Sequence, residues 1–240
     1  MKYMKSDDVI KIYEEWKKQY GAETYKHMSE ILEEIKRRHK EDWSKHPTKK
    51  QDYEQSWRAF KGKIFERLVQ HIITNEIKEL GLKVVNGNEL ERSNDLSNEL
   101  SKIKDNLAIN YGEEFGTFLP DVDIVIYDPD NDRSKVLVVI SSKVTLRERI
   151  AQTGYWKFKL LQNEKTKDIK VYFITLDEDG TLTRKKPPKK GRAIVEVDLD
   201  CTYVLTEEKI EESDKVKLFE HFIDDLKELL KNEKNKNSPF

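Results

Sequence analysis

Cysteine is almost absent from this chain, in which Cys201 is the one thiol among 240 residues. A single cysteine cannot form an internal disulfide bond, and the sequence has no CxxC motif and no Cys/His cluster of the kind that binds zinc. We therefore expect a protein of a reducing compartment that folds without a structural zinc ion.

Long apolar runs are also missing. The first residues, MKYMKSDDVIKIYEEW, lack the apolar core of a signal peptide. No stretch approaches the ~18 apolar residues that a membrane span needs. These absences predict a cytoplasmic protein with no membrane partner.

The chain has almost no net charge, because 45 Lys and Arg residues stand against 46 Asp and Glu residues, for a formal charge of -1. It is not a simple polycation, so any contact with nucleic acid must come from Lys and Arg residues gathered locally. Charged residues still make up 38% of the sequence, which indicates a heavily solvated surface.

The apolar residues that are present follow two periodicities. Helical spacing over residues 6–20, 28–35 and 53–81 predicts a helical first third. Beyond it we expect strands at 82–85, 123–127, 135–140, 171–176 and 193–197, and helices at 96–103, 145–162 and within 204–230. This order predicts an α/β fold, with a mixed sheet flanked by helices and an N-terminal helical region. We place the boundary between residues 1–48 and a core of residues 49–240, a length that suits one main hydrophobic core.

Two predicted strands carry the residues with the clearest chemistry. The first reads Pro120-Asp121-Val122-Asp123-Ile124, and the second ends in Ser141-Ser142-Lys143. Side chains alternate along a strand, so Asp121 shares a face with Asp123, and Ser141 with Lys143. If the strands are neighbours, carboxylates meet a lysine, and such a group can hold Mg²⁺ against a phosphate and orient a water. The alternative is a structural role, in which each Asp is an ordinary turn residue at the start of a strand and the Lys is solvated at a strand end.

The segment after the second strand makes the pattern more specific. It reads Ser141-Ser142-Lys143-Val144-Thr145-Leu146-Arg147-Glu148-Arg149. From Pro120 to about Leu160 the chain resembles the PD-(D/E)XK type II restriction endonucleases that recognise CCGG, in their SxK…RER variant. The resemblance implies that Ser141 occupies the position of an acid in the active site.

The same resemblance implies that Arg147, Glu148 and Arg149 read bases in the major groove. Arginine can donate two hydrogen bonds to guanine, and glutamate can accept from cytosine. Thr145 and Glu148 also fit a capping box, in which the two arginines would be surface charges. Following directly on the SxK strand, the base-reading interpretation is favoured.

The chain departs from the better-known relatives at one place. They carry a Glu about 13 or 14 positions after the lysine, where this chain has Trp156 and Lys157. Our candidate for the second acid is Glu66, which flanks an apolar stripe on the long helix at 53–81. A surface Glu66 paired with Lys63 or Gln70 is the alternative.

Two further segments permit simple interpretations. The basic run from Arg184 to Arg192 is either a phosphate contact or a solvated hairpin loop. The run Tyr155-Trp156-Lys157-Phe158 is expected to pack into the core and not to stack on bases.

The functional hypothesis is Mg²⁺-dependent hydrolysis of double-stranded DNA at a palindromic site containing CCGG. The expected site residues are Asp121, Asp123 and Glu66 for the metal, Lys143 and Ser141 beside them, and Arg147, Glu148 and Arg149 for DNA. A homodimer or larger homo-oligomer suits a palindrome, because each subunit then reads one half. The alternatives are a PD-(D/E)XK repair or junction-resolving nuclease and a catalytically inactive DNA-binding module.

Overall fold

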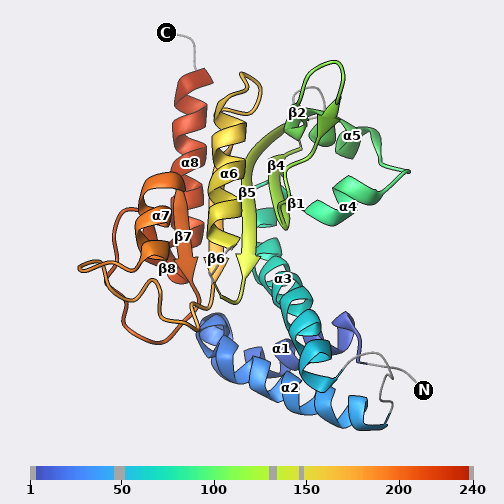
Figure 1. Ribbon diagram of the computed structural model, residues 1–240, viewed down its shortest axis with the longest axis vertical. Helices are drawn as coiled ribbons and strands as arrows, with labels where there is room; N and C mark the ends of the chain where they lie inside the picture. Colours follow the sequence, from blue (N-terminus) through green and yellow to red (C-terminus); the bar gives the residue numbers. More distant parts are fainter. Residues whose placement is uncertain (1–3, 46–51, 130–133, 146–148, 238–240) are drawn as a thin grey trace.

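The computed structural model describes residues 4–45, 52–129, 134–145 and 149–237 (Figure 1). The α-helices are α1 (Ser6–Tyr20), α2 (Met28–Lys45), α3 (Tyr53–Glu79), α4 (Gly87–Arg92), α5 (Asn98–Leu107), α6 (Arg149–Leu161), α7 (Lys190–Asp198) and α8 (Phe222–Asn237), and the 3-10 helices are η1 (Gly21–His27) and η2 (Phe219–His221). The strands are β1 (Lys83–Asn86), β2 (Ile109–Asn110), β3 (Thr117–Phe118), β4 (Ile124–Asp128), β5 (Lys135–Lys143), β6 (Lys170–Thr175), β7 (Cys201–Val204) and β8 (Val216–Leu218). Within these described ranges, no helix is both long and apolar enough to cross a bilayer.

The larger sheet is mixed, and β5 lies in its interior. The strand order is β1-β4-β5-β6-β7-β8, with antiparallel pairing from β1 to β5 and parallel pairing from β5 to β8. Along β5, every residue from Val136 to Ser142 is buried. A continuous apolar run is what a strand covered on both faces requires. Strands β2 and β3 form a separate two-stranded hairpin.

Helices cover both faces of the sheet and produce three layers (Figure 1). On one face, α3 and α8 pack with strand residues such as Ile124 and Ile140. On the other face, α5, α6 and α7 pack with the intervening residues Val125 and Val139. Successive side chains of a strand point to opposite faces, so each buried strand contributes to both cores. The predicted mixed sheet flanked by helices is confirmed.

The N-terminal helices α1 and α2 pack against α3 at one end of the molecule (Figure 1). Helix α3 starts where Asp52 caps its first turn by accepting a hydrogen bond from the Gln55 N–H, at 2.8 Å. It then runs for 27 residues and shares one core with the N-terminal helices and the sheet. The N-terminal helical region is therefore present, while the predicted boundary after residue 48 lies outside the described residues.

One predicted strand is wrong. The run at 193–197 has strand composition but lies within α7. Its buried residues Arg192 and Val195, followed by the buried Leu199, recur at helical spacing. The strand of this region is β7, which follows directly and is buried at all four positions. Packing decided the local structure here against the β propensity of Ile194, Val195 and Val197.

The basic run from Arg184 to Arg192 is neither a hairpin loop nor wholly exposed. Arg184 is exposed, whereas Arg192 at the start of α7 is 0% exposed. The Arg192 guanidinium donates to the carbonyl oxygens of Leu182 and Glu211 and pairs with Glu196 at 2.8 Å. Arg192 is thus a structural cation that joins α7 to two loops and is not free to contact phosphate.

Replacing Arg192 with alanine should lower the free energy of unfolding by about 3 kcal/mol or more, because it leaves buried carbonyls and Glu196 without their donor. Arg184→Ala, which removes an exposed guanidinium from the same run, should change the stability by less than about 0.5 kcal/mol. Urea unfolding followed by circular dichroism measures both. Equal effects of the two substitutions would contradict the structural role of Arg192.

Candidate active site

Asp123 lies immediately before β4 and is held by β5. Its N–H donates to the Ile140 carbonyl at 3.0 Å, which extends the β4–β5 ladder by one step. Its carboxylate accepts two hydrogen bonds, from the Ser142 N–H at 2.6 Å and from Lys143 Nζ at 2.9 Å. Asp123 is only 5% exposed, so these two donors compensate the cost of burying its charge.

Lys143 is the last residue of β5 and joins three elements of the fold. Its Nζ donates to Asp123 Oδ1 and, at 2.6 Å, to Glu66 Oε1 on α3. Burial lowers the pKa of Lys143, but the charges of Asp123 and Glu66 more than offset burial and leave that pKa above its usual value. The lysine is therefore an ammonium ion with carboxylates on two sides.

Glu66 is the second carboxylate in contact with Lys143. Burial, followed by the negative charge of Asp123, raises the pKa of Glu66 to about 7, although Lys143 opposes the shift. The pairing of Glu66 with Lys63 or Gln70, considered as an alternative, is replaced by the contact with Lys143. We call Asp123, Glu66 and Lys143 the carboxylate–lysine cluster.

The donor set of this cluster fits a hard divalent cation. Two carboxylates that contact one nitrogen have oxygens close together, and Mg²⁺ prefers carboxylate oxygens of this kind. Asp123 and Glu66 are the residues that could hold the ion. Ser141, at the position of the missing acid, is 6% exposed and lies beside Phe173 of β6 in the sheet register. Its neutral hydroxyl carries no negative charge, and the second carboxylate that contacts Lys143 is that of Glu66 on α3.

Asp121 lies away from the cluster contacts. It is exposed and precedes β4, so strand alternation does not place it beside Asp123. Its Oδ2 instead accepts a hydrogen bond from Gln152 Nε2 at 2.6 Å, and Gln152 Oε1 accepts one from Arg149 at 3.2 Å. Asp121 is therefore connected to the first turn of α6. The assumption that both aspartates share a strand face is wrong.

The predicted base-reading residues are described only in part. Arg147 and Glu148 lie outside the described residues, which leaves the capping box and the base-reading triplet as predictions. Arg149 is exposed and begins α6, four residues later than the predicted helix start at 145. Gln152, one turn after Arg149, is a neighbour that the sequence interpretation missed. The sequence could have indicated Gln152, because residues three positions apart on a helix are neighbours, and Gln152 follows Arg149 by three.

The run Tyr155-Trp156-Lys157-Phe158 divides between the core and the surface. Trp156 packs against the core, and the buried Lys157 pairs with Asp200 at 2.6 Å. Tyr155 and Phe158 are exposed, so the expectation of core packing is wrong for these two rings.

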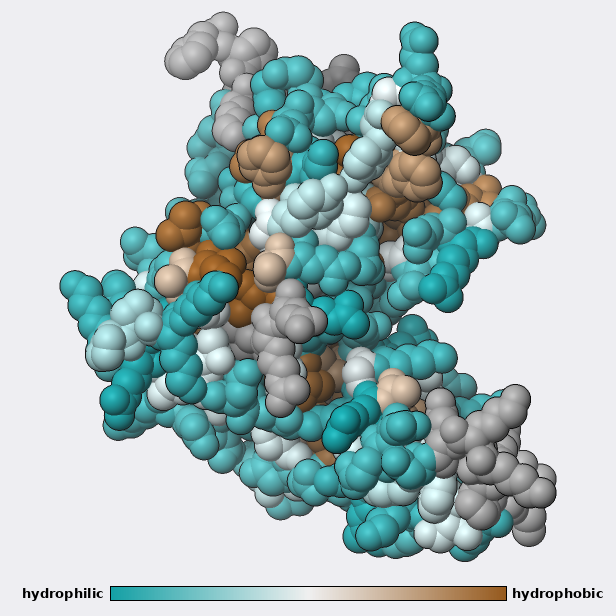
Figure 2. All heavy atoms as spheres, viewed as in Figure 1, coloured by the Kyte–Doolittle hydropathy of each residue, from teal (hydrophilic) through white to brown (hydrophobic). Residues whose placement is uncertain are grey.

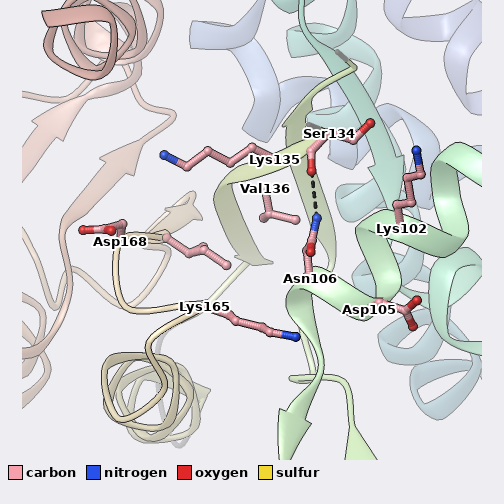
Figure 3. A pocket seen from close by; sticks show the side chains of 9 residues that line it. Lys102, Asp105, Asn106, Ser134, Lys135, Val136, Lys165 and Asp168 are labelled. Carbon is pink, nitrogen blue, oxygen red and sulfur yellow. Dashed lines mark hydrogen bonds between the residues drawn. The ribbon is translucent and has the colours of Figure 1, made fainter. Parts of the chain in front are cut away.

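A cavity of about 560 Å³ lies at the other end of β5 (Figure 3). It is lined by Lys135 and Val136 at the start of the strand, and by Asn106, which donates to the Ser134 carbonyl at 2.7 Å. Lys135 and Lys143 are eight positions apart along β5, which corresponds to about 26 Å of extended strand. The cavity is therefore distinct from the carboxylate–lysine cluster.

The raised pKa of Glu66 predicts a pH dependence of stability in metal-free buffer. Between pH 4.5 and about 7, Glu66 ionises in the unfolded chain but keeps its proton in the fold, so the free energy of unfolding should fall as pH rises, by about 1 to 3 kcal/mol. Glu66→Gln should remove this part of the fall. Glu79→Gln, an exposed change at the end of the same helix, should retain it. Urea titrations from pH 4.5 to 8 with EDTA present compare the three proteins, and parallel curves for Glu66→Gln and the native chain would contradict the assignment.

Comparison with known proteins gives consistent matches to one class of enzyme. The family described as BsaWI restriction endonuclease type 2 matches residues 99–225. MjaVIP of Methanocaldococcus jannaschii, named as a type II restriction enzyme, is 38% identical over 216 residues, which cover 85% of this chain and 94% of that protein. HpyAORF263P of Helicobacter pylori, also named as a type II restriction enzyme, is 34% identical over 128 residues, which cover 53% of this chain and 64% of that protein.

The fold has a solved counterpart. The restriction endonuclease PspGI in complex with substrate DNA superposes with a TM-score of 0.52, covering 95% of this chain and 96% of that one at 16% identity, which supports the fold alone. Family membership comes from the sequence matches, which cover more than half of the chain and extend over both the sheet and the carboxylate–lysine cluster. The chain belongs to the BsaWI family of type II restriction endonucleases, which are site-specific endonucleases.

Proposed function

We propose that this restriction enzyme hydrolyses phosphodiester bonds of double-stranded DNA in a Mg²⁺-dependent reaction, at a palindromic site containing CCGG. The observation that carries the proposal is the double contact of Lys143 Nζ with Asp123 and Glu66. This arrangement gathers from β4, β5 and α3 the two acids and the cation that a PD-(D/E)XK active site needs, although Ser141 stands at the usual position of one acid.

The residues divide the chemistry between them. Asp123 and Glu66 would hold the cation, and a bound Mg²⁺ would supply charge for the scissile phosphate and lower the pKa of a coordinated water. Lys143 keeps its proton and donates hydrogen bonds to the attacking water or to a phosphate oxygen. The Ser142 N–H fixes the Asp123 carboxylate, so at least one acid is oriented before substrate arrives. The neutral Ser141 hydroxyl adds no negative charge at the position where one acid is usually found.

Recognition is proposed for the start of α6. Arg147 and Arg149 would donate to guanine, and Glu148 would accept from cytosine amino groups. Gln152 accepts a hydrogen bond from Arg149, and Asp121 accepts one from Gln152, so this pair would orient one reading side chain from the segment before β4 that also contains Asp123. Asp121, first expected at the metal, is thus proposed to position Arg149. Two such subunits in a homodimer would read the two halves of a palindrome.

Substitution of the two aspartates, Asp123 and Asp121, should have different effects on cleavage. Asp123→Asn should reduce Mg²⁺-dependent cleavage of plasmid DNA by at least about 1000-fold, because the ion loses an anionic ligand. Asp121→Asn should reduce cleavage less than about tenfold, because the amide oxygen still accepts the Gln152 hydrogen bond. Reactions with Mg²⁺ and with EDTA, and calorimetric titration of Ca²⁺ into each variant, measure cleavage and ion binding separately. Loss of ion binding in Asp121→Asn would contradict this role and identify Asp121 as a metal ligand.

Glu148→Gln tests sequence recognition independently of cleavage. The variant should bind CCGG duplexes about 10- to 100-fold more weakly, since one lost contact to a base edge is worth about 1–3 kcal/mol. Its affinity for a duplex with scrambled central bases should stay unchanged, because phosphate contacts carry that binding. Glu164→Gln, an exposed change beyond the end of α6, is the matched control. An unchanged ratio of the two affinities would remove Glu148 from base reading.

A further inference from the structure

The turn after β6 lies at the edge of the sheet that carries the carboxylate–lysine cluster. Strand β6 runs parallel to β5, and its last residue, Thr175, stands opposite Lys143 in the register. Parallel strands end at the same edge of a sheet, so the chain that leaves β6 begins beside the residue that ends β5. We call residues 175–182 the β6 turn. None of its residues belongs to the carboxylate–lysine cluster.

Thr175 holds the first peptide group beyond β5. It is 0% exposed, and its hydroxyl donates to the Val144 carbonyl at 3.3 Å. The same hydroxyl accepts a hydrogen bond from the Asp177 N–H at 3.0 Å. Val144 follows Lys143 directly, after the last pair of the β5–β6 ladder. The hydroxyl therefore connects the strand end that carries Lys143 to the backbone of the β6 turn, beyond the point where the ladder fixes it.

Asp177 determines the shape of the β6 turn. Its φ of 54° lies in the left-handed region, which costs energy for a residue other than glycine. Its buried carboxylate accepts hydrogen bonds from the Thr181 and Leu182 N–H groups, at 2.8 and 2.7 Å. Its carbonyl accepts a third from the Gly180 N–H at 2.7 Å. Three hydrogen bonds to one residue stabilise this conformation, so the hydroxyl of Thr175 is held by a closed turn.

Glu178, the next residue, connects the β6 turn to α3. Both of its carboxylate oxygens accept from Lys61 Nζ, at 2.6 and 2.8 Å. Lys61 lies on α3 five positions before Glu66, or about 7.5 Å along the helix axis. Figure 2 shows a hollow in the surface between the sheet layers and the N-terminal helices, and α3 crosses from one part to the other (Figure 1). A contact from the sheet edge to this helix therefore helps to set where Glu66 stands.

We propose that Thr175 and Glu178 are positioning residues of the active site. Thr175 fixes the end of β5, so that Lys143 Nζ meets both carboxylates. Glu178 fixes α3, so that Glu66 reaches the same nitrogen. Displacing a reacting group by about 1 Å can slow a reaction about 100-fold, so contacts of this kind bear on the rate of cleavage. The inference rests on the proposed Mg²⁺-dependent cleavage of DNA but not on the CCGG sequence.

A second buried threonine provides a matched control. Thr202 lies on β7, opposite Phe173 of β6, and is also 0% exposed. Within the described residues, its hydroxyl has no hydrogen-bond partner. Replacing Thr202 with valine therefore changes a buried hydroxyl to a methyl group in the same sheet without removing a contact to β5.

The test is the rate constant of single-turnover DNA cleavage, measured with saturating enzyme and Mg²⁺ at a temperature where circular dichroism shows each variant to be folded. Thr175→Val should lower the rate constant about 10- to 100-fold, because both hydrogen bonds of the hydroxyl are lost. Thr175→Ser keeps the hydroxyl and should stay within about threefold of the native rate constant. Thr202→Val should stay within about twofold.

An exchange of charges tests Glu178. Glu178→Lys should lower the same rate constant about threefold to tenfold, because it replaces an attraction with a repulsion between two ammonium groups. The double variant Lys61→Glu with Glu178→Lys restores the attraction and should return to within about twofold of the native value. Glu178 is exposed, so this exchange remains a test if Thr175→Val does not fold. A Glu178→Lys defect that the double variant does not restore overturns the role of Glu178.

A native rate constant in Thr175→Val, or a Thr175→Ser protein as slow as Thr175→Val, overturns the role of Thr175. Titration calorimetry with Ca²⁺ measures the cluster without cleavage: Thr175→Val should raise the Kd of the ion about threefold or more, and Thr202→Val should leave it unchanged. A native chain that binds Ca²⁺ and cleaves no DNA would contradict the proposed function alone, because the Ca²⁺ Kd of Thr175→Val still supports or overturns the positioning role. A native chain that binds no ion contradicts both.

Discussion

The contact of one buried ammonium ion with two carboxylates is the interaction on which the active site depends. Lys143 stands at the end of an interior strand, and the two acids come from the start of the neighbouring strand and from a helix that crosses to the N-terminal region. Each charge is mostly removed from water, so each requires the others; an uncompensated buried charge costs several kcal/mol. The buried runs of β4 and β5 and the apolar stripe of α3 bring these groups together, and the cluster in turn links three elements that would otherwise share only apolar contacts.

The cluster contains one more acid than base, and this imbalance connects structure to chemistry. Without a cation, burial and the Asp123 charge keep a proton on Glu66 until the pH approaches 7. A divalent ion bound by the same oxygens would release that proton and supply the missing positive charge, so proton and cation are alternatives at one site. The additional carboxylate is the feature that supports the proposed cation site, because a purely structural role would be met by one carboxylate and one lysine.

The sequence allowed much of this arrangement to be predicted, and the failures have identifiable causes. Strands β4, β5 and β6 were recognisable because burial on both faces demands continuous apolar runs, and Glu66 because it flanks the apolar stripe of α3. Strand alternation did not support the expected position of Asp121, because alternation holds only inside a strand, and β4 begins after this residue. Residues 193–197 were placed wrongly because β-branched composition carries no information on the α6 surface that α7 covers. The Ser142 N–H that orients Asp123 is a backbone group, which any residue supplies and no sequence pattern reveals.

Helix α6 shows most clearly what the isolated fold does not explain. It buries Lys157, whose charge is paired with Asp200, while Tyr155 and Phe158 lie at the surface. A helix selected only to cover its own sheet would place an aromatic ring at the buried position and the lysine outside, since lysine is among the residues least often buried. The observed order separates two sides of one helix: Ile150, Thr153 and Leu160 are buried, and the rings of Tyr155 and Phe158 are exposed. Packing onto the sheet therefore accounts for the buried side of α6 and not for the aromatic residues on its exposed side.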